Sequence, residues 1–481
     1  MMSVFIGRQS ELQDLFDLTK KKTAAFVVVK GRRRIGKSRL IKEFGKSFPY
    51  FHSFVGLAPD EKTSNKHQLE EFSRQIAREF KTSFARYDDW SDALWAIGER
   101  VKSGKRLLLF DEISWMGSKD PTFLGKIKNF WDQQLKENNQ LIFIICGSAS
   151  AWIEKNILSS SGFVGRVSFT LNLGELSLTD CADFWPKTIS AYEKLKVLSI
   201  TGGVPKYLEE INPKLSAEEN IKRLCFSKGG FLVNEFEQIF SDIFLRKSEY
   251  YKKIVKSLAS GAKEINEITS QVKGQRLGRI PEYLWELELA GMITRDHTFN
   301  IKTGIDSDLS RYRLSDNYLR FYLKYIEKDL SKINRRAFAY KSMSSFSEWN
   351  TIMGLQFENL ILNNRKQIQD YLNISASDII CDNPFFQRKT TRTAACQIDY
   401  LIQTKFGTLY VCEIKFSKSP IGIAIIKEVQ AKITALKFPK GFSCRPILIH
   451  VNGVTDEVVD SDYFASIVDF SNFLIGKFKR A

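Results

Sequence analysis

The first stretch of this sequence that could do chemistry is a glycine-rich loop between a short apolar run and a helix-forming segment. It reads Gly31-Arg32-Arg33-Arg34-Ile35-Gly36-Lys37-Ser38 and is followed by Arg39. Glycines at the two ends let backbone N–H groups wrap around phosphate oxygens at a helix N-terminus. The lysine would reach the β- and γ-phosphates of a nucleotide, and the serine hydroxyl would bind Mg²⁺. The spacing therefore predicts a phosphate-binding loop for ATP.

A second feature is an apolar run that ends in two acids. Residues 105–110 lead into Asp111 and Glu112, as expected where a buried strand reaches the ligand-binding edge of a parallel sheet. We expect Asp111 to hold the Mg²⁺ shell and Glu112 to polarise the water that attacks the γ-phosphate. Another apolar run, residues 141–146, leads into Ser148, whose hydroxyl would sense the γ-phosphate.

A separate set of polar residues lies near the end of the chain. Asp399 and Glu413 fall on two expected strands joined by a tight turn. Lys415 shares a strand face with Glu413, because alternate residues of a strand point to the same side. We expect Asp399 and Glu413 to bind one Mg²⁺ and Lys415 to orient or deprotonate a water that attacks a phosphodiester. Glu358, on a preceding expected helix, would complete the acidic set.

The hydrophobic pattern predicts the elements that position these residues. Apolar runs separated by helix-length segments in the first part predict a doubly wound parallel α/β sheet. In the middle, three helices over 248–260, 264–272 and 277–290 are followed by a hairpin, which is the order of a winged helix. The last part predicts a helix, two strands, a second helix and a further strand. The fold class is therefore α/β, with a helical stretch over 217–244 between the first sheet and the middle segment.

Composition narrows the function classes. Lys and Arg number 72 against 55 Asp and Glu, a net charge of +17 over 481 residues, which favours polyanionic partners. No apolar run approaches the roughly 18 residues of a membrane span, so we expect a cytoplasmic protein without membrane contact. The seven cysteines lie far apart with no C-x-x-C pair, and the four histidines show no zinc or hydrolase spacing, so we expect reduced buried thiols.

The first half of the chain resembles the prokaryotic AAA+/STAND-like ATPases, often called archaeal-type ATPases. The resemblance rests on both phosphate-site motifs and on Phe5-Ile6-Gly7-Arg8, Cys146-Gly147-Ser148, Gly165-Arg166 and Gly203-Val204-Pro205. It implies that Gly7 and Arg8 lie near the adenine and that Ser148 is the sensor. It also implies that Arg166 acts as an arginine finger in a homo-oligomer and that Pro205 helps to place a helical lid. The chain departs from the family in Arg32 to Arg34, which either tighten phosphate or nucleic-acid binding or form a solvated loop tip.

The rear modules carry further resemblances. The middle segment is similar to the winged helix that follows such ATPases, and residues 246–345 hold 20 Lys and Arg against 12 Asp and Glu. DNA contact would fall to the start of its third helix, at Lys273, Gln275, Arg276 and Arg279. A winged helix that docks on protein is the alternative. The last segment resembles the PD-(D/E)XK nuclease fold, which also serves in non-cleaving binding modules.

These expectations give one organisation and two functions. The predicted parts are an ATPase domain (1–205), a helical lid (206–245), a winged helix (246–320), a linker helix (321–344) and a nuclease-like domain (345–481). The favoured function is ATP binding and hydrolysis coupled to nucleic-acid engagement, with Mg²⁺-dependent DNA cleavage by the last domain. The alternative is a regulatory switch that binds ATP and a protein or DNA target and cuts nothing.

Overall fold

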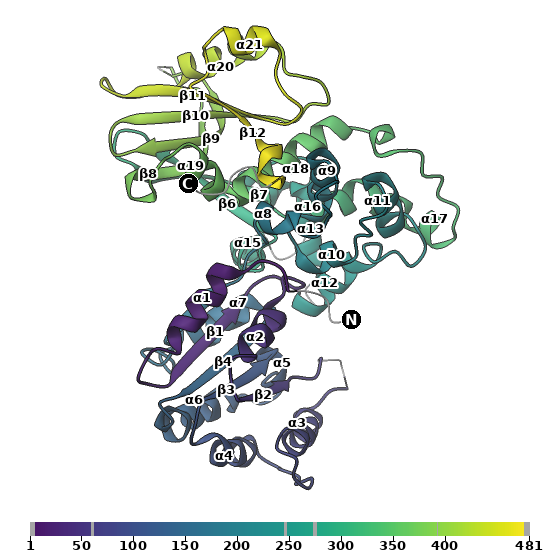
Figure 1. Ribbon diagram of the computed structural model, residues 1–481, viewed down its shortest axis with the longest axis vertical. Coiled ribbons are helices and arrows are strands. Elements are labelled where there is room, and N and C mark those ends of the chain that lie inside the picture. The colour runs from purple at the N-terminus through teal and green to yellow at the C-terminus, as the bar shows by residue number, and fades with distance from the viewer. Residues whose placement is uncertain (1–4, 59–61, 245–247, 273–276, 392, 476–481) are drawn as a thin grey trace. The chain divides into compact units, whose positions relative to one another are not determined.

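The structure is a computed structural model that describes residues 5–58, 62–244, 248–272, 277–391 and 393–475 (Figure 1). The chain divides into two compact units. The first is built from Met1–Gly174 with two short later segments, Ile239–Arg246 and Trp285–Gly291. The second comprises Glu175–Gln238, Lys247–Leu284 and Met292–Ala481.

The first unit is organised around a five-stranded parallel sheet of order β2-β3-β4-β1-β5. Its strands are β1 (Ala25–Lys30), β2 (Tyr50–Val55), β3 (Arg106–Asp111), β4 (Leu141–Gly147) and β5 (Phe169–Asn172). The three apolar runs form the centre, as predicted. The two flanking strands, β2 and β5, were not foreseen, since only alternate residues in them are buried and the apolar pattern is weak.

Helices cover both faces of this sheet (Figure 1). On one face, α2 (Lys37–Gly45) packs against β3 and β4, and α1 (Gln9–Leu18) packs on α2. The other face carries α3 (Asn65–Glu79), α4 (Trp90–Val101) and α6 (Phe123–Gln133). Two short helices, α5 (Ile113–Met116) and α7 (Ser150–Ile153), follow β3 and β4.

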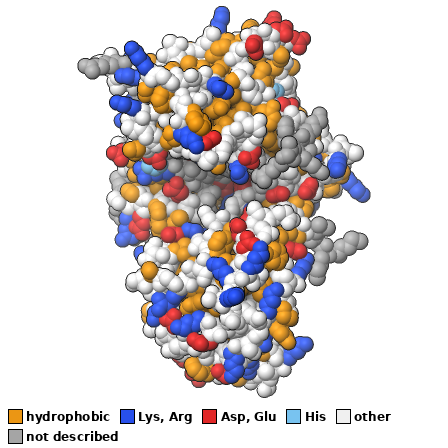
Figure 2. Space-filling model, turned by 60° about the vertical axis from the view of Figure 1, so that its left-hand side comes forward, with side chains coloured by type: hydrophobic (Ala, Val, Ile, Leu, Met, Phe, Trp, Pro, Cys, Tyr) orange, Lys and Arg blue, Asp and Glu red, His pale blue; other side chains and the backbone are white. Residues whose placement is uncertain are grey.

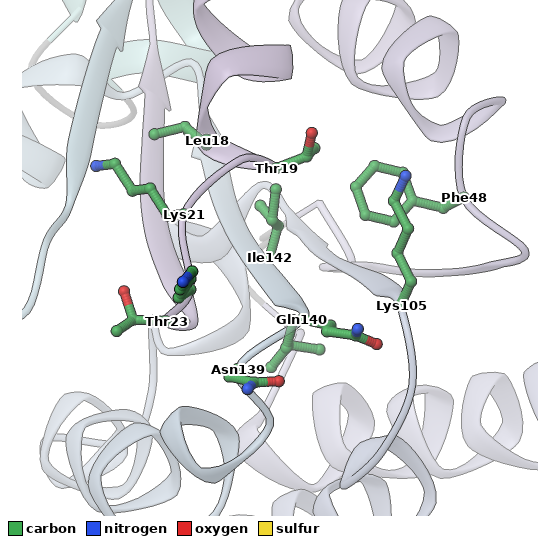
Figure 3. A pocket seen from close by; sticks show the side chains of 11 residues that line it. Leu18, Thr19, Lys21, Thr23, Phe48, Lys105, Asn139, Gln140 and Ile142 are labelled. Atoms are coloured by element: carbon green, nitrogen blue, oxygen red, sulfur yellow. The ribbon is translucent and has the colours of Figure 1, made fainter.

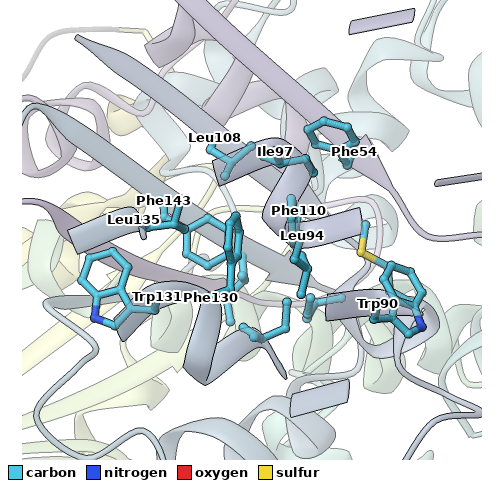
Figure 4. Packing of buried hydrophobic residues seen from close by; sticks show 14 of the residues in the cluster. Phe54, Trp90, Leu94, Ile97, Leu108, Phe110, Phe130, Trp131, Leu135 and Phe143 are labelled. Atoms are coloured by element: carbon cyan, nitrogen blue, oxygen red, sulfur yellow. The ribbon is translucent and has the colours of Figure 1, made fainter. Parts of the chain in front are cut away.

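An aromatic core fixes that second layer of helices to the sheet (Figure 4). Phe110 of β3 and Phe143 of β4 meet edge to face with ring centroids 5.1 Å apart. Trp90 and Leu94 of α4 and Phe130 of α6 pack into the same cluster. Burial of such large apolar side chains holds β3 and β4 rigidly, so the polar groups at their carboxyl ends are presented on a fixed edge.

The second unit begins with helices and then forms a three-helix segment with a hairpin. The first helices are α8 (Leu178–Ala182), α9 (Ala191–Thr201), α10 (Pro205–Glu209) and α11 (Ala217–Cys225), followed by α12 (Glu235–Phe244), whose residues from Ile239 onward are assigned to the first unit. The expected three helices are α13 (Ser248–Leu258), α14 (Ile265–Gln271) and α15 (Ile280–Leu289), of which α15 from Trp285 onward is also assigned to the first unit. The hairpin strands are β6 (Ile293–Asn300) and β7 (Ile305–Leu314). An isolated bridge between Lys263 and Tyr312 joins the helical part to β7.

The last part is a mixed five-stranded sheet of order β12-β11-β10-β9-β8. Its elements are α16 (Asn317–Phe321), α17 (Leu330–Asn334), α18 (Trp349–Asn363), α19 (Arg365–Tyr371), β8 (Ile379–Gln387), β9 (Cys396–Thr404), β10 (Thr408–Lys415), α20 (Ala424–Ala435), β11 (Ser443–His450), α21 (Asp456–Asp460) and β12 (Ser466–Asp469). Strands β8, β9 and β10 pair antiparallel, whereas β10, β11 and β12 pair parallel. The crossover from β10 to β11 is α20, as a parallel pair requires.

The hairpin β6–β7 packs on this C-terminal sheet. Phe299 and Ile301 of the hairpin share a buried cluster with Phe385 of β8 and Ile398 of β9. The backbone N–H of Phe386 also donates to the hydroxyl of Thr298 at 3.3 Å. The hairpin is therefore committed to a protein contact within the second unit.

The surface charge is dispersed. On the face shown in Figure 2, Lys and Arg side chains are spread over the chain and are interspersed with Asp and Glu. The excess of basic residues therefore does not outline one groove for a polyanion on that face. Within the described part of the chain, no helix combines the length and apolar character that a membrane span requires.

Candidate functional site

The phosphate-binding loop connects β1 to α2 and depends on its glycines. Gly31 has a φ of 150°, and a Cβ there would lie 2.4 Å from the carbonyl oxygen of Leu173. Gly36 caps α2 with a φ of 91°. Only residues without a Cβ adopt such conformations without strain. The loop therefore brings its backbone to the N-terminus of α2, which is the arrangement that binds phosphate.

Lys37 lies under this loop with its ammonium group surrounded by acceptors. Its Nζ donates to the carbonyl oxygens of Gly31 (2.9 Å) and Arg32 (3.1 Å) and to the hydroxyl of Ser148 (3.0 Å). Burial lowers the pKa of Lys37, and the negative charge of Glu112 opposes that shift. The lysine therefore has a fixed position from which it can reach the oxygens of a phosphate.

Ser38 and Asp111 provide a pair of oxygens suited to Mg²⁺. The hydroxyl of Ser38 donates to Oδ2 of Asp111 at 2.6 Å. The other oxygen, Oδ1, accepts the backbone N–H of Glu112 at 3.0 Å and the thiol of Cys146 at 2.7 Å. Hydroxyl and carboxylate oxygens are the ligands that Mg²⁺ prefers. The residues present therefore fit the predicted ion, which Ser38 and Asp111 would hold.

Cys146 is a contributor that the sequence did not reveal. It is fully buried at the end of β4, and the parallel register that pairs Phe110 with Ile145 brings it beside Asp111. Burial raises the pKa of its thiol, so it stays protonated and acts as a donor. Cys146 follows Ile145, which pairs with Phe110 across the two strands. The sequence would indicate this contact only if the order of the strands were already known.

The position of Glu112 is fixed by its backbone conformation and by hydrogen bonds from Ser148. Its φ of 52° lies in the left-handed region, which is unusual for a residue with a Cβ. The carboxylate accepts the backbone N–H of Ser148 at 3.1 Å and its hydroxyl at 2.8 Å. The structure therefore brings Lys37, Ser38, Asp111, Glu112 and Ser148 together, although their catalytic roles stay predictions.

Arg8 is part of the frame around the loop. Its guanidinium is buried, donates to the carbonyl oxygens of Ile35 (3.3 Å) and Gly174 (2.5 Å), and pairs with Glu11 at 2.8 Å. Arg8 has a φ of 66°, and the preceding Gly7 has a φ of 71°. This segment therefore anchors the phosphate loop to α1, and its place near the adenine stays a prediction.

The other residues predicted for the nucleotide site, Arg166, Arg32, Arg34, Arg39 and Pro205, make separate local contacts. Arg166 forms a two-point ion pair with Asp132, with Nε–Oδ1 at 2.9 Å and Nη2–Oδ2 at 2.8 Å. The hydrogen bond to Asp132 raises the pKa of Arg166. Arg32 is buried, Arg34 takes a left-handed φ of 69°, and the guanidinium of Arg39 lies 6.0 Å from the ring of Phe5. Pro205 is the first residue of α10, in the second unit.

A separate cavity of about 350 Å³ opens at the other edge of the same sheet (Figure 3). Its lining comes from the end of α1, from the segments before β1, β2, β3 and β4, and from the start of β4, and it includes Lys21, Lys22 and Lys105 but no carboxylate. Phe48 forms part of the wall, with the ammonium of Lys105 5.0 Å from its ring centre. Since a strand of six residues is about 20 Å long, this basic cavity is distinct from the phosphate-binding edge.

In the second unit, strand register brings the C-terminal acids together. Cys412 of β10 pairs with Tyr400 of β9, which places Glu413 beside Asp399. The backbone N–H of Ile414 donates to Oδ2 of Asp399 at 3.0 Å. The Nζ atom of Lys415 lies 3.1 Å from Oε1 of Glu413, and the side chain of Glu413 is only 2% exposed. The predicted grouping of Asp399, Glu413 and Lys415 on one face is therefore present.

A lysine that sequence reasoning missed lies between the two acids. Nζ of Lys432, on α20, is 2.5 Å from Oε2 of Glu413 and 3.7 Å from Oδ1 of Asp399. Within the described ranges, no three Asp, Glu, His or Cys side chains are close enough to hold a metal ion. The oxygens suit Mg²⁺, but in this arrangement an ammonium group occupies the space between them. The three-acid metal site therefore stays a prediction.

Burial and mutual repulsion perturb the acids of this cluster. Burial, together with the charge of Glu413, raises the pKa of Asp399 to about 6. Burial and the charge of Asp399 raise the pKa of Glu358 to about 7, although Arg313 and Arg320 oppose the shift. Glu358 therefore senses the cluster electrostatically from α18. Carboxyl groups whose pKa is shifted by desolvation and by a neighbouring charge occur often at functional sites.

The predicted DNA-contacting residues fall largely outside the described ranges. Lys273, Gln275 and Arg276 belong to the undescribed segment before α15. Arg279 is described and exposed.

Comparisons with known proteins bear on the first part of the chain. Residues 5–211 match the family described as an ATPase domain predominantly from Archaea, which confirms the prediction of an archaeal-type ATPase domain there. An uncharacterized protein of Methanocaldococcus jannaschii, MJECL04, is 25% identical over 362 residues, covering 74% of this chain and 76% of the relative.

Solved structures with a similar chain course are more distant. The Walker-type ATPase PABY2304 of Pyrococcus abyssi has 16% identity and a TM-score of 0.47, covering 66% of this chain and 96% of that one. The ORC2 protein of Aeropyrum pernix, solved as ADPNP and ADP complexes, has 12% identity and a TM-score of 0.42, covering 70% and 97%, respectively.

Proposed function

We propose that this protein binds and hydrolyses ATP in its first unit and uses the nucleotide state to control how its second unit engages nucleic acid. The observation that carries the ATPase part is the 2.6 Å contact between Ser38 and Asp111, with Glu112 one residue further on. This places a Mg²⁺-type oxygen pair next to a carboxylate that can accept a proton. The matched ATPase family supports the same reading of residues 5–211.

The residues would divide the work as follows. The loop N–H groups and Lys37 bind the phosphates, and Ser38 and Asp111 hold the metal ion, which neutralises charge on the β- and γ-phosphates when bound. Glu112 orients the attacking water and accepts its proton. Ser148 now bonds both Lys37 and Glu112, so an arriving γ-phosphate would compete for the same groups.

Phosphate release from Mg²⁺ and ATP tests this part. Glu112→Gln should retain ATP binding and lower the turnover rate by about 100-fold or more, because general-base catalysis supplies a factor of that order. Lys37→Ala should lose ATP binding. The matched controls are Glu137→Gln and Lys42→Ala, which alter exposed side chains of the same unit. Unchanged release by Glu112→Gln would remove the assigned base.

For the second unit, we propose a PD-(D/E)XK-like module that cleaves DNA with Mg²⁺. The order α18, β8, β9, β10, α20, β11 supports it, since a helix precedes three antiparallel strands and a crossover helix leads to a parallel strand. The register of Asp399 with Glu413 supports it further, because both oxygen sets then face one cation position. Lys415 would orient the water that attacks the phosphodiester.

The three helices and hairpin before this module fit a winged helix, with the hairpin as its wing. Because Phe299 and Ile301 of that hairpin pack on the C-terminal sheet, we propose that the wing serves as an internal dock and that DNA contact falls to the start of α15, which Arg279 immediately precedes. Binding of labelled duplex DNA should then weaken with salt and with Arg279→Ala. Binding that is insensitive to both would favour a protein partner.

The second candidate function is a switch that cuts nothing. It is favoured by one observation, the ammonium of Lys432 between Asp399 and Glu413. Incubation of supercoiled plasmid with the full chain and Mg²⁺ separates the two. The nuclease proposal expects nicking that Asp399→Ala abolishes and that Asp460→Ala, an exposed control on α21, leaves intact. Absence of nicking by the unaltered chain, with ATP binding retained, selects the switch.

A further inference from the structure

Lys432 belongs to the C-terminal cluster, but the proposed cleavage chemistry assigns it no role. It approaches the acids from α20, a different element from the strands that carry them. Its Nζ lies 2.5 Å from Glu413 and 3.7 Å from Asp399. A metal ion shared by the two carboxylates would have to occupy this same position.

The two lysines of the cluster differ in their partners. Lys415 pairs with Glu413 at 3.1 Å and also with Glu428 of α20 at 2.8 Å. Among the described residues, the ion pairs of Lys432 are confined to the two site acids. Burial would lower the pKa of Lys432, but the charges of Asp399 and Glu413 outweigh burial and raise it. The ammonium of Lys432 thus lies directly against the carboxylate of Glu413, which is only 2% exposed.

We infer that Lys432 is an internal cation that exchanges with the divalent metal ion of the proposed site. This rests on the proposed metal site but not on cleavage. Mg²⁺ lies about 2.0–2.1 Å from its oxygen ligands, so it and the ammonium cannot occupy one position between these carboxylates. The side chain of Lys432 is 28% exposed, and its four-carbon stem allows the ammonium to move outward. The acids therefore stay neutralised until a metal ion displaces the lysine.

Mn²⁺ binding tests the exchange on the full chain without nucleotide. Lys432→Met should bind Mn²⁺ at least about tenfold more tightly than the unaltered protein in calorimetric titration, since a competing charge is removed. Lys427→Met, an exposed control on the same helix, should bind as the unaltered protein does. Adding Asp399→Asn to Lys432→Met should cancel the gain, which assigns it to this site and not to the phosphate loop. Equal or weaker binding by Lys432→Met overturns the inference.

A second measurement needs no substitution. Acylation of lysines, read by mass spectrometry, should label Lys432 more strongly when Mn²⁺ is added, because its ammonium leaves the acids, whereas labelling of Lys427 should not change. Labelling of Lys432 that stays constant while Mn²⁺ binds refutes the exchange. So does a protein in which neither the unaltered chain nor Lys432→Met binds Mn²⁺. A protein that shows the exchange and leaves plasmid intact refutes only the nuclease proposal.

Discussion

Replacing Glu358 by Gln should stabilise the protein at neutral and alkaline pH. Glu358 lies on α18, and burial together with the nearby charge of Asp399 raises its pKa from 4.5 to about 7. A carboxyl group whose pKa is higher in the folded than in the unfolded chain binds its proton more tightly when folded. Ionisation of this group therefore costs stability as the pH rises.

The size of the effect follows from the two pKa values. Their difference corresponds to an upper limit of about 3 kcal/mol. The cost is absent below pH 4.5, where the group is protonated in both states, grows between pH 4.5 and about 7, and is constant above that. Glu358→Gln keeps the shape and removes the charge, so it should raise the unfolding free energy by about 1–3 kcal/mol at pH 8 and by about a quarter of that amount at pH 5.

Chemical denaturation at pH 5, 6, 7 and 8, followed by a probe in the second unit, measures this. Glu457→Gln, an exposed control on α21, should show no such pH-dependent gain. A stabilisation that is equal at pH 5 and pH 8, or a loss of stability at pH 8, would show that ionisation of Glu358 does not cost the folded protein stability. The expected gain is the free energy that ionisation of Glu358 costs the folded protein.

Three further substitutions probe other contacts. Cys146→Ala removes the thiol that donates a hydrogen bond to Asp111, the aspartate proposed to hold the metal ion. The loss of about 1 kcal/mol should weaken Mg²⁺-dependent binding of a fluorescent ATP analogue about fivefold, whereas the buried control Cys225→Ala should leave the affinity unchanged. Equal affinities of Cys146→Ala and the unaltered protein would contradict this role of the thiol. Gly31→Ala places a Cβ 2.4 Å from the carbonyl oxygen of Leu173 and should abolish nucleotide binding. Retained binding would show that the loop can adopt a different backbone conformation and still bind the nucleotide. Phe299→Ala opens the cluster between hairpin and sheet and should cost the second unit about 3–5 kcal/mol in denaturation; a loss below 1 kcal/mol would mean that the hairpin contact is incidental.

The sequence predicted the elements of both units where periodicity and local motifs were strong. The central strands β1, β3 and β4 are continuous apolar runs. The glycine-rich loop motif predicts that a helix, α2, begins directly after it. Edge strands β2 and β5 were missed because they are half exposed, so their pattern is not continuous. In the last sheet, the turn at Gly407 and the two-residue period were enough to pair Asp399 with Glu413.

What the sequence could not predict is contact across elements. Cys146 reaches Asp111 only because β3 and β4 are neighbours in parallel register, and Lys432 reaches Glu413 only because α20 crosses that part of the sheet. The packing of the hairpin on β8 and β9 is of the same kind. Each contact joins residues that are far apart in the chain, and single-sequence periodicity contains no information on such pairs.

The central claim is that nucleotide state controls nucleic-acid engagement. Its most direct test is the affinity of the full-length Glu112→Gln protein for a fluorescent DNA duplex, measured by anisotropy with Mg²⁺ and saturating ATP and then with saturating ADP at the same salt concentration. If the nucleotide controls DNA binding, the dissociation constants should differ by at least about fivefold between the two nucleotides, which is the lower range of allosteric coupling. Equal affinities in the two states, with both nucleotides bound, would contradict it.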